Sequence, residues 1–381
     1  MTSPEPQDPR VVTTPPEPVD LSEIERALTK LWKPPEGHAG DSHALTRACM
    51  SNLIIHGTTR EQAGLIPDEI DVLVRQHPAR VLLLVDEDDR EGTAIEAFVS
   101  ARCHLAGKHS RVCSEHVTIN ASGDAVRRLP SVARSLLIGD LPTTLWWASD
   151  EAPPLGGELF RELAAMSDQV IYSSQAWPDP ALGTLAMADW AGAVDPEQPD
   201  IADLSWGRLK SWRRLMSQSL DPAVLPGAVG AIDRIDVEYG PFGLPQAWLL
   251  VGWLSSRLGW LPTGSTSGKG QGQDSVASFH SPRGPLDVRF RMLAEGEPEV
   301  RSAAVTWKGE GGPATMTFAT HGPGRLGATG VGIDIEPRIL AAPVPTRALL
   351  VAAELKDLEF DLAFREALLI ARALAQASIH S

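Results

Sequence analysis

The sequence predicts an α/β protein with two domains. The first is an N-terminal open α/β sheet domain with helices on both faces, and the second is a smaller α+β C-terminal domain with an antiparallel meander sheet. The chain has 381 residues, and a domain usually holds roughly 100–200 residues. Apolar runs typical of buried strands alternate with helical segments as far as Gly192. Beyond that point several strands follow one another, with helices before and after them.

The N-terminal 20 residues are rich in proline and polar side chains, so we expect residues 1–20 to form a disordered tail. They contain no basic stretch followed by an apolar one, which argues against a signal peptide. Residues 21–32 place apolar side chains on one helical face and predict an amphipathic helix. The N-terminal α/β domain is expected over residues 21–222.

The most clearly defined strand of this domain is ARVLLLV at residues 79–85. A continuous apolar run of this length is typical of a strand buried on both faces. Residues 95–105 and 111–120 flank a short loop and predict an antiparallel hairpin. A helix over 67–76 would carry Pro67 in its first turn. The other expected elements are an apolar segment within 43–55, helices at 124–138, 156–167 and 178–190, and strands at 141–149 and 168–174.

A helix is also predicted over residues 200–220, where apolar side chains recur at three- and four-residue spacing between Leu209 and Leu220. Asp200 or Asp203 could cap its N-terminus.

Residues 222–227 read as a linker, and the C-terminal α+β domain is expected over residues 228–381. Its elements, in order, are a strand at 231–239, a helix at 244–260, a Gly/Ser-rich loop at 263–274, strands at 275–280, 286–293, 299–308 and 314–321, and a helical tail at 345–379.

The charge balance limits the classes of partner. The chain has 34 basic and 49 acidic side chains and a net charge of −15. Nucleic acid and anionic membrane surfaces need clustered Lys and Arg, so neither is expected as the main partner. No apolar run reaches the roughly 18 residues of a membrane-spanning helix. The three cysteines do not form a secreted disulfide framework, so the cytoplasm is the expected location.

Two glycine-rich segments are similar to phosphate-binding motifs but do not fit them. GSTSGKG at 264–270 has three residues between its first Gly and the Gly-Lys pair, where a phosphate-binding loop needs four. GPGRLG at 322–327 matches G-x-G-x-x-G, but the residues after it are poor helix formers, and dinucleotide binding needs a helix there. A loop and a glycine-rich turn are the favoured interpretations, and no cofactor is expected.

Cys103 and Cys113 would lie opposite each other if the turn of the predicted hairpin centres near residue 108. With the neighbouring histidines they could hold zinc, or they could form a cross-strand disulfide. Two packed free thiols are favoured, because disulfides are rare in the cytosol. The sequence also lacks the nucleophile elbow G-x-S-x-G, so no catalytic residue or metal site is expected.

Tryptophan and arginine provide the unusual chemistry of the chain. Asp140 and Pro142 precede a predicted strand and favour an extended backbone there. Trp146 and Trp147 within that strand point to opposite faces, so both faces must be covered. We interpret these four residues as a structural motif.

The second such segment is DLSWGRLKSWRRL at 203–215. There Trp206 and Trp212 alternate with Arg208 and Arg213. This pattern suits an anion site, cation–π stacking or a protein interface. The alternative is a pair of buried indole rings on a helix whose arginines extend into solvent.

These two segments, in this order and about sixty residues apart, resemble the OpcA family. Three further segments are similar to that family: HPARVLLLV at 77–85, DQVIYSS at 168–174 and AWLLVGWLSSRLGW at 247–260. The resemblance covers most of residues 43–310 and depends on the order and spacing of all five segments.

The resemblance implies a function. OpcA proteins associate with glucose-6-phosphate dehydrogenase of the oxidative pentose phosphate pathway, promote its assembled state and raise its activity, and they are not known as catalysts. Under this hypothesis the partner-binding candidates, as contact or support residues, are Trp206, Arg208, Trp212 and Arg213, and the structural anchors are Trp146 and Trp147.

Two alternatives remain open at this point. The chain could be a sensor that binds a sugar phosphate at the carboxyl ends of the parallel strands, with Asp140 and the Arg-rich helix lining the site. It could also be an enzyme that acts through Cys or His.

Overall fold

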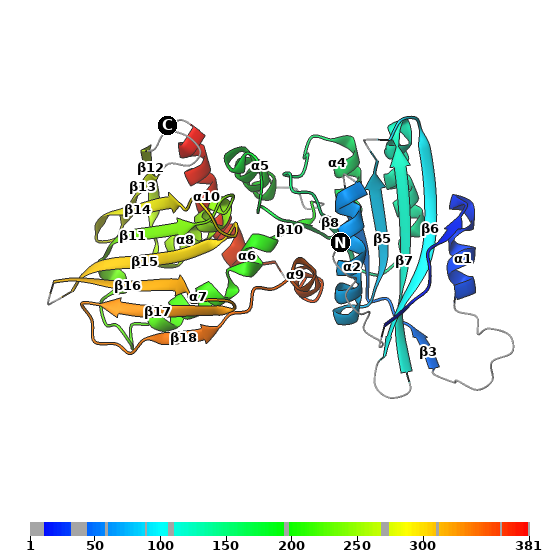
Figure 1. The fold of residues 1–381 in the computed structure, drawn as a ribbon. Coiled ribbons are helices and arrows are strands. Elements are labelled where there is room, and N and C mark those ends of the chain that lie inside the picture. The colour runs from blue at the N-terminus through cyan, green and yellow to red at the C-terminus, as the bar shows by residue number, and fades with distance from the viewer. Residues whose placement is uncertain are drawn as a thin grey trace.

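The computed structural model describes residues 11–31, 44–57, 60–87, 90–105, 110–193, 198–267, 274–309, 312–358 and 360–379. Two β-sheets lie side by side, and several helices pack between them (Figure 1). None of the helices in these ranges combines the length and the apolar character that a membrane crossing needs.

The first sheet contains ten strands within the described ranges. Their bounds are β1 (Val11–Thr13), β2 (Glu17–Val19), β3 (Ala44–Arg47), β4 (Ser51–Gly57), β5 (Ala79–Asp86), β6 (Ala94–Leu105), β7 (Ser110–Ser122), β8 (Thr143–Trp147), β9 (Gln169–Tyr172) and β10 (Asp200–Asp203). They follow the order β1-β6-β7-β5-β4-β8-β9-β10, with β2 also paired to β6 and β3 to β7.

Six strands of this sheet, from β7 to β10 in that order, are parallel to their neighbours. The chain runs outward from β4 through β5 to β7, returns to β8 beside β4, and runs outward again to β10. The order therefore reverses between β4 and β8. In open α/β sheets the crevice at such a reversal, at the carboxyl ends of the strands, is the usual ligand site, and this strand order is the one found in dinucleotide-binding sheets.

Helices cover both faces of this sheet, as predicted. Their bounds are η1 (Leu21–Glu23), α1 (Ile24–Leu31), α2 (Arg60–Gln76), η2 (Gly123–Arg128), α3 (Leu129–Leu136), α4 (Glu158–Ala164) and α5 (Pro180–Gly192). On one face Ile70 of α2 belongs to the same buried cluster as Leu83 of β5. On the other face Phe160 of α4 and Leu145 of β8 share a second cluster. Helix α2 connects β4 to β5, before the strand order reverses, and α4 connects β8 to β9, after the reversal. The two helices therefore cover opposite faces.

The second sheet follows the order β12-β13-β14-β11-β15-β16-β17-β18. Its strands are β11 (Ile232–Tyr239), β12 (Leu261–Ser267), β13 (Ser275–Ser281), β14 (Gly284–Met292), β15 (Val300–Gly309), β16 (Gly312–Thr320), β17 (Arg325–Val331) and β18 (Arg338–Ala341). The predicted antiparallel meander is confirmed for most neighbours. The exception is β11, which lies between β14 and β15 and pairs with β14 in parallel.

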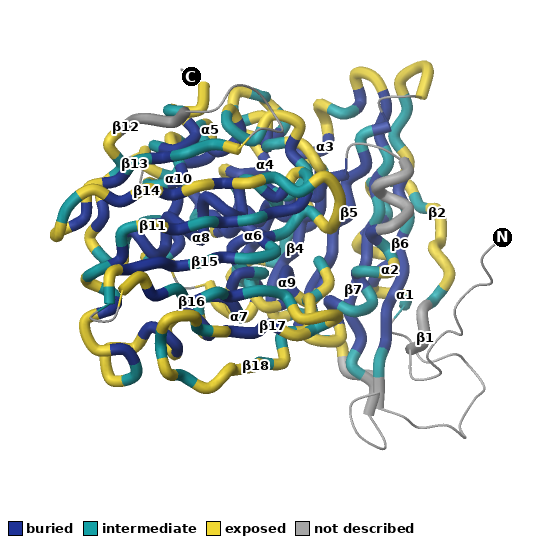
Figure 2. Tube along the Cα trace, turned by 60° about the vertical axis from the view of Figure 1, so that its left-hand side comes forward, coloured by how far each residue is buried: buried dark blue, intermediate teal, exposed yellow. Residues whose placement is uncertain are grey.

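The helices of this half are α6 (Leu204–Arg208), α7 (Lys210–Ser219), η3 (Val229–Ala231), α8 (Leu244–Leu258), α9 (Arg347–Glu354) and α10 (Leu362–Ile379). The centre of this half is α8, which is buried along most of its length (Figure 2). A Cβ atom on Gly252 would lie 2.3 Å from the carbonyl oxygen of Ala367. Glycine at this position therefore allows α10 to pack directly on the backbone of α8.

The predicted helical tail is two helices rather than one, and they lie in different places. Helix α10 packs against α8 and α5, whereas α9 packs against α2 of the first sheet. Val351 of α9 shares a buried cluster with Trp146 and Ile171 of the first sheet. The C-terminal segment thus contributes to the core of the N-terminal half. The boundary at residues 222–228 stays a prediction.

Several local expectations need correction. Residues 11–13 and 17–19 are not disordered, because they pair as strands with β6, while residues 1–10 lie outside the described ranges. Helix α2 begins at Arg60, so Pro67 lies inside it and not in its first turn.

The segment predicted as one helix from residue 200 begins as a strand, since Asp200–Asp203 pairs with β9. Helix α6 starts only after Asp203, whose side chain accepts a hydrogen bond from the backbone of Ser205.

The predictions for the two glycine-rich segments had different outcomes. Residues 261–267 form β12, where a loop was expected from residue 263, and 268–273 lie outside the described ranges. Gly322 and Gly324 have φ of 66° and 65°, a left-handed conformation that favours glycine. Strand β17 follows them, so the predicted glycine turn without a helix is confirmed.

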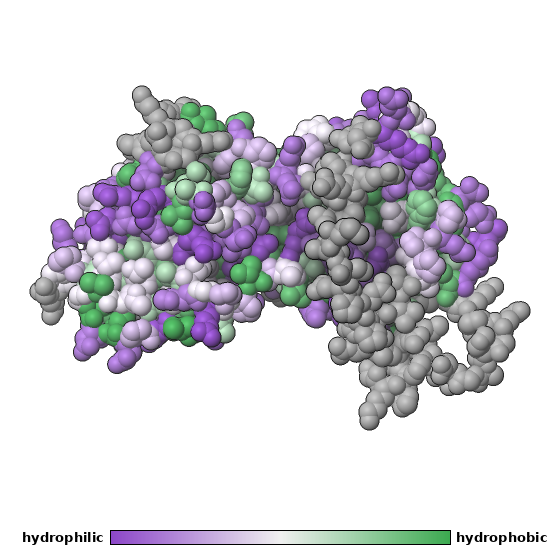
Figure 3. Space-filling view, viewed as in Figure 1, coloured by the Kyte–Doolittle hydropathy of each residue, from purple (hydrophilic) through white to green (hydrophobic). Residues whose placement is uncertain are grey.

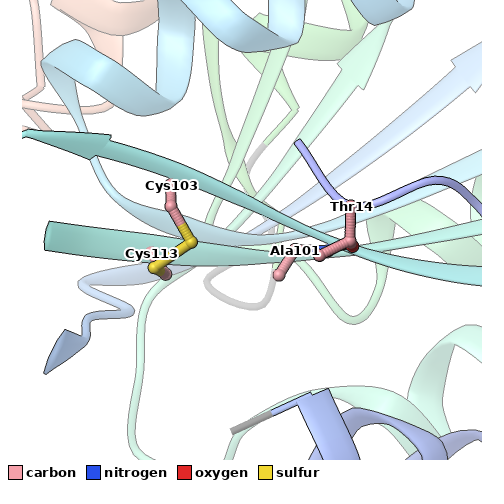
Figure 4. The surroundings of a disulfide bond; sticks show 4 residues. All are labelled: Thr14, Ala101, Cys103 and Cys113. Atoms are coloured by element: carbon pink, nitrogen blue, oxygen red, sulfur yellow. A yellow bond between two sulfur atoms is a disulfide. The ribbon is translucent and has the colours of Figure 1, made fainter. Parts of the chain in front are cut away.

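The expectation of free thiols was wrong for Cys103 and Cys113. The register of the β6–β7 hairpin places them directly opposite, with Cα atoms 4.0 Å apart, and their sulfur atoms are joined in a disulfide (Figure 4). The register is the one expected for a hairpin centred near residue 108, so the pairing of the two cysteines follows from it. The bond uses the thiolates that the zinc alternative required. Within the described ranges, no three His, Cys, Asp or Glu side chains cluster as metal ligands.

Removing this disulfide should destabilise the protein. The bond closes a loop with a sequence separation of 10, and in the chain-entropy account a loop of that size contributes about 2–3 kcal/mol. We expect the double variant Cys103→Ser/Cys113→Ser to lose that free energy of unfolding in urea titrations. The wild-type chain in a strong reductant should match it.

Cys49→Ser is the control, because Cys49 is a free cysteine outside the bond, and its urea midpoint should stay close to that of the wild type. A wild-type curve that does not change on addition of reductant would contradict the prediction.

Candidate functional site

The first Trp-containing segment lies at the centre of the parallel sheet. Asp140 is exposed and has a left-handed backbone, with φ of 65°, just before the amino end of β8. Trp146 and Trp147 belong to the two different buried clusters on opposite faces of the sheet, which confirms their predicted directions. Both rings are almost fully buried, at 1% and 4% exposure.

Trp147 packs against two aromatic rings. The imidazole of His56, on the neighbouring strand β4, stacks on it at 4.0 Å, and Phe160 of α4 contacts it edge-on at 5.4 Å. Burial lowers the pKa of His56 to about 4, so this ring is neutral at pH 7. Neither of its nitrogens has a hydrogen-bond partner among the described residues. His56 therefore acts as part of the aromatic packing.

The second segment is held rigidly at its start. Asp203, at the end of β10, is fully buried, and its carboxylate accepts hydrogen bonds from the backbone N–H groups of Ser174 and Ser205, at 3.1 and 2.8 Å. Burial raises the pKa of Asp203, and these hydrogen bonds oppose that shift. The cap fixes the direction in which α6 leaves the sheet.

Trp206 and Arg213 form a stacked pair. The guanidinium of Arg213 lies 3.4 Å above the Trp206 ring and donates a hydrogen bond to the Trp206 carbonyl oxygen. The indole N–H donates to Asp361 at 2.7 Å. Trp206 and Trp212 are only 5% and 7% exposed. Both indoles are thus placed to support the segment from beneath. Lys210 and Arg214 are its exposed basic side chains, whereas Arg208 and Arg213 are only partly exposed.

Carboxylates from the C-terminal region surround this pair. Burial lowers the pKa of Arg213 to about 10, an effect that the charges of Asp361 and Glu354 oppose. Burial, followed by repulsion from Asp361 and Asp357, raises the pKa of Glu354 to about 7. Glu354 is therefore divided between its protonated and charged forms near neutral pH.

A groove of about 1180 Å³ runs along this segment. Its walls are α6 and α7, the turn between β16 and β17, the connection from β18 to α9, and α9 itself. Its basic lining residues are Arg208, Lys210, Arg213, Arg301 and Arg325, and its acidic ones are Glu297, Glu299, Glu354, Asp357 and Asp361. The groove thus offers charges of both signs.

A smaller pocket of about 140 Å³ lies at the carboxyl ends of β8 and β9. Its lining residues are Trp146, Trp147, Ala148, Ser149, Asp150, Ser173, Gln175, Ala176, Arg208, Pro298 and Arg347. Arg208 lines both this pocket and the groove. Asp140, which was expected beside such a site, precedes β8 and so lies at the opposite end of the strand.

Sequence reasoning missed Arg347, Glu354 and Asp361. All three lie in the segment predicted as one helical tail, more than 130 positions beyond Arg208, and no motif marks them. The only signal was the unusual Trp and Arg content of residues 203–215, which indicated one wall of the groove but not the other.

Comparisons with known proteins agree with the sequence resemblance. A family model described as the glucose-6-phosphate dehydrogenase subunit N-terminal domain matches residues 71–189, and one for the C-terminal domain of that subunit matches residues 199–368. The protein OpcA of Synechocystis sp. (strain PCC 6803), named for the OxPP cycle, is 32% identical over 196 residues, which are 50% of this chain and 39% of that protein. OpcA of Nostoc punctiforme is 32% identical over 239 residues, which are 62% of this chain and 47% of that protein. The chain thus spans less than half the length of these curated relatives.

Among solved structures, the crystal structure of an oxidoreductase from Sinorhizobium meliloti superposes with a TM-score of 0.51 and 10% sequence identity. The match covers 88% of this chain and 97% of that one. At this identity the likeness concerns the fold alone. Because the two subunit models together match most of its residues, the chain belongs to the OpcA family of glucose-6-phosphate dehydrogenase subunits.

Proposed function

We propose that this chain is a non-catalytic partner of glucose-6-phosphate dehydrogenase in the cytoplasm, which promotes the assembled state of the dehydrogenase and raises its activity. The observation that carries the proposal is the match of both subunit models, one after the other, over residues 71–189 and 199–368. A partner of this kind activates by binding the active conformation more tightly than the inactive one, and its differential affinity sets the size of the effect.

The strand order of the first sheet raises the alternative of a dinucleotide-dependent enzyme. Two sequence features support the non-catalytic proposal instead. Strand β4 ends at Gly57, and Thr58 and Thr59 follow it in the sequence, with no G-x-G-x-x-G at the point where a pyrophosphate would need it. The bulky pair Trp146 and Trp147 ends β8, the strand across the reversal from β4.

We further propose that the groove beside residues 203–215 contacts the dehydrogenase. Buried Trp206 and Trp212 would hold the helices in place, and Arg208 and Arg213 would present charge to the partner. On the face in Figure 3 hydrophobic residues form small separated patches among polar ones. The groove itself is lined by charges of both signs, so an interface there would depend on polar and charged contacts.

The first test is association. The purified chain and the dehydrogenase of the same organism should co-elute in size-exclusion chromatography, and the chain should raise the rate of the dehydrogenase. The variant Lys210→Glu reverses an exposed charge in the groove. We expect it to weaken the affinity about tenfold at low salt, and the difference from the wild type should shrink at high salt because salt screens exposed charges. Melting curves should show that the variant remains folded.

Lys308→Glu is the matched control, because Lys308 is exposed near the end of β15 that lies away from the groove. Its affinity should equal that of the wild type. No co-elution and no change in rate would overturn the proposed partner, whereas equal losses in both variants would overturn the docking surface alone.

A second candidate function is the sensing of a sugar phosphate, which could coexist with the first. The observation that favours it is the pocket at the carboxyl ends of β8 and β9, because Arg208 from the Arg-rich segment lines it.

A further inference from the structure

The pocket at the ends of β8 and β9 is built from distant parts of the chain. Ser149 and Ser173 follow the two strands, Arg208 ends α6, Pro298 comes from the connection between β14 and β15, and Arg347 begins α9. Its volume of about 140 Å³ exceeds the roughly 10–15 Å³ that a single water needs. It therefore has room for a small polyatomic molecule at the position where open α/β sheets usually bind ligands.

Arg208 is the unsatisfied group of this pocket. Its Nε atom is buried and has no hydrogen-bond partner among the described residues. Its other contacts are long, at 3.4 Å to Glu299 and 3.2 Å to the carbonyl oxygen of Pro345. Burial lowers the pKa of Arg208 more than the charge of Glu299 raises it. A buried donor without an acceptor is unfavourable, and a bound anion would supply the missing acceptor.

Arg347 differs from Arg208 because its charge is already balanced. Its guanidinium donates to both carboxylate oxygens of Glu69 at 2.6–3.1 Å, in a bidentate pair, and lies 5.3 Å from the centre of the Trp146 ring. It therefore forms a fixed wall of the pocket and adds little net positive charge. Asp150, the one acidic residue of the lining, is exposed, so water screens its repulsion of an anion.

We propose that this pocket binds the phosphate group of a small phosphorylated sugar, with Arg208 as the main ligand of the phosphate. A guanidinium matches phosphate oxygens with a fork of paired N–H donors. The hydroxyls of Ser149 and Ser173 suit the hydroxyl groups of a sugar. The Gln175 amide does too: its N–H donates to the Pro298 carbonyl oxygen at 3.0 Å, which fixes the amide, and an amide oxygen can accept a hydrogen bond.

The position of Arg208 also connects the two sites. Because its side chain lines the groove as well as the pocket, a phosphate that engages Nε would fix the side chain that forms part of the groove wall. The inference rests on the proposed function only for the choice of a sugar as the carrier of the phosphate. Its test uses the chain alone, so failure here leaves the association with the dehydrogenase untouched, and the reverse also holds.

The test is isothermal titration calorimetry of the full chain with glucose 6-phosphate, inorganic phosphate, glucose and gluconate. We expect glucose 6-phosphate to bind, inorganic phosphate to bind more weakly, and glucose to give no signal. Binding of gluconate as tight as that of glucose 6-phosphate would assign the pocket to carboxylates and overturn the phosphate. Absence of binding by both phosphate compounds would overturn the site.

Variants locate the binding. Arg208→Gln should weaken binding of glucose 6-phosphate at least tenfold, and Arg208→Lys should weaken it less, because the charge remains and the fork is lost. Arg289→Gln, the same change on an exposed position of β14, should bind like the wild type. If Arg208→Gln does not fold, the Arg208→Lys variant provides the test. Wild-type affinity for glucose 6-phosphate in folded Arg208→Lys would overturn the role of Arg208.

Discussion

Replacing Arg80 with methionine is expected to lower the free energy of unfolding by about 3 kcal/mol. Arg80 is the second residue of β5, at the start of its apolar run. Its side chain is only 4% exposed, and its Nε donates to Glu115 of β7 at 2.7 Å. Its Nη1 donates to Glu25 of α1 and to the carbonyl oxygen of Leu136 at the end of α3, each at 2.7 Å. One side chain thus joins the sheet to two helices.

The expected loss comes from the partner that remains. Glu115 is fully buried, and removing one member of a buried pair costs about 3–5 kcal/mol because the other charge stays in the interior. Arg47 also contacts Glu115, at 2.8 Å, so the lower end of that range applies. Methionine fills most of the volume of the arginine stem, so a cavity contributes little.

Urea titration followed by circular dichroism measures this loss. Arg134→Met, on the exposed side of α3, is the matched control and should unfold like the wild type. Adding Glu115→Gln to Arg80→Met should recover part of the stability, because the stranded charge is then removed. Equal midpoints for Arg80→Met and Arg134→Met would contradict the prediction.

This buried pair shows where the sequence was informative and where it was not. Residues 79–85 were correctly predicted as a buried strand, because a continuous apolar run is a local signal. The same holds for the β6–β7 hairpin and for α8. The run also contains Arg80, and nothing local indicates that Glu25 and Glu115, which are 55 and 35 positions away, neutralise it.

Elements decided by tertiary contacts were harder to predict. The strand at 200–203 reads as the start of a helix, because the residues after it have helical spacing, and only its pairing with β9 makes it extended. Strands β17 and β18 were missed, since glycines and a proline interrupt the apolar pattern there. The predicted register placed Cys103 opposite Cys113, but free thiols were preferred because a cytosolic location was expected. The fold does not determine the redox compartment.

The candidate site was half predictable for the same reason. Arg208 and Arg213 belong to a segment whose composition is unusual by itself. Their counterparts Glu354 and Asp361 lie beyond the second sheet, and the pocket exists only because α9 returns to the first sheet. A short motif cannot encode a site whose walls come from both halves of the chain.

Replacing Trp147 with alanine is expected to cost about 3–5 kcal/mol, the usual range for a buried tryptophan. The change removes a ring that is 4% exposed, together with its stacking on His56 and its edge contact with Phe160. Packed aromatic pairs contribute about 0.5–1.5 kcal/mol beyond their buried area. Trp147→Phe should lose less, and Leu261→Ala, at a side chain that is 65% exposed, should lose almost nothing.

The pH dependence separates loss of packing from general unfolding. In the wild type the folded pKa of His56, about 4, lies below its unfolded value of 6.5. The unfolded chain therefore binds more protons between these values, and the contribution of His56 to stability falls as the pH drops from about 6.5 towards 4. Water entering the space left by Trp147→Ala would raise the folded pKa towards 6.5 and flatten this part of the stability profile. NMR can follow the titration of His56 in the folded Trp147→Ala variant. Wild-type stability together with a wild-type His56 titration would show that the Trp147 ring does not hold β4 and β8 together.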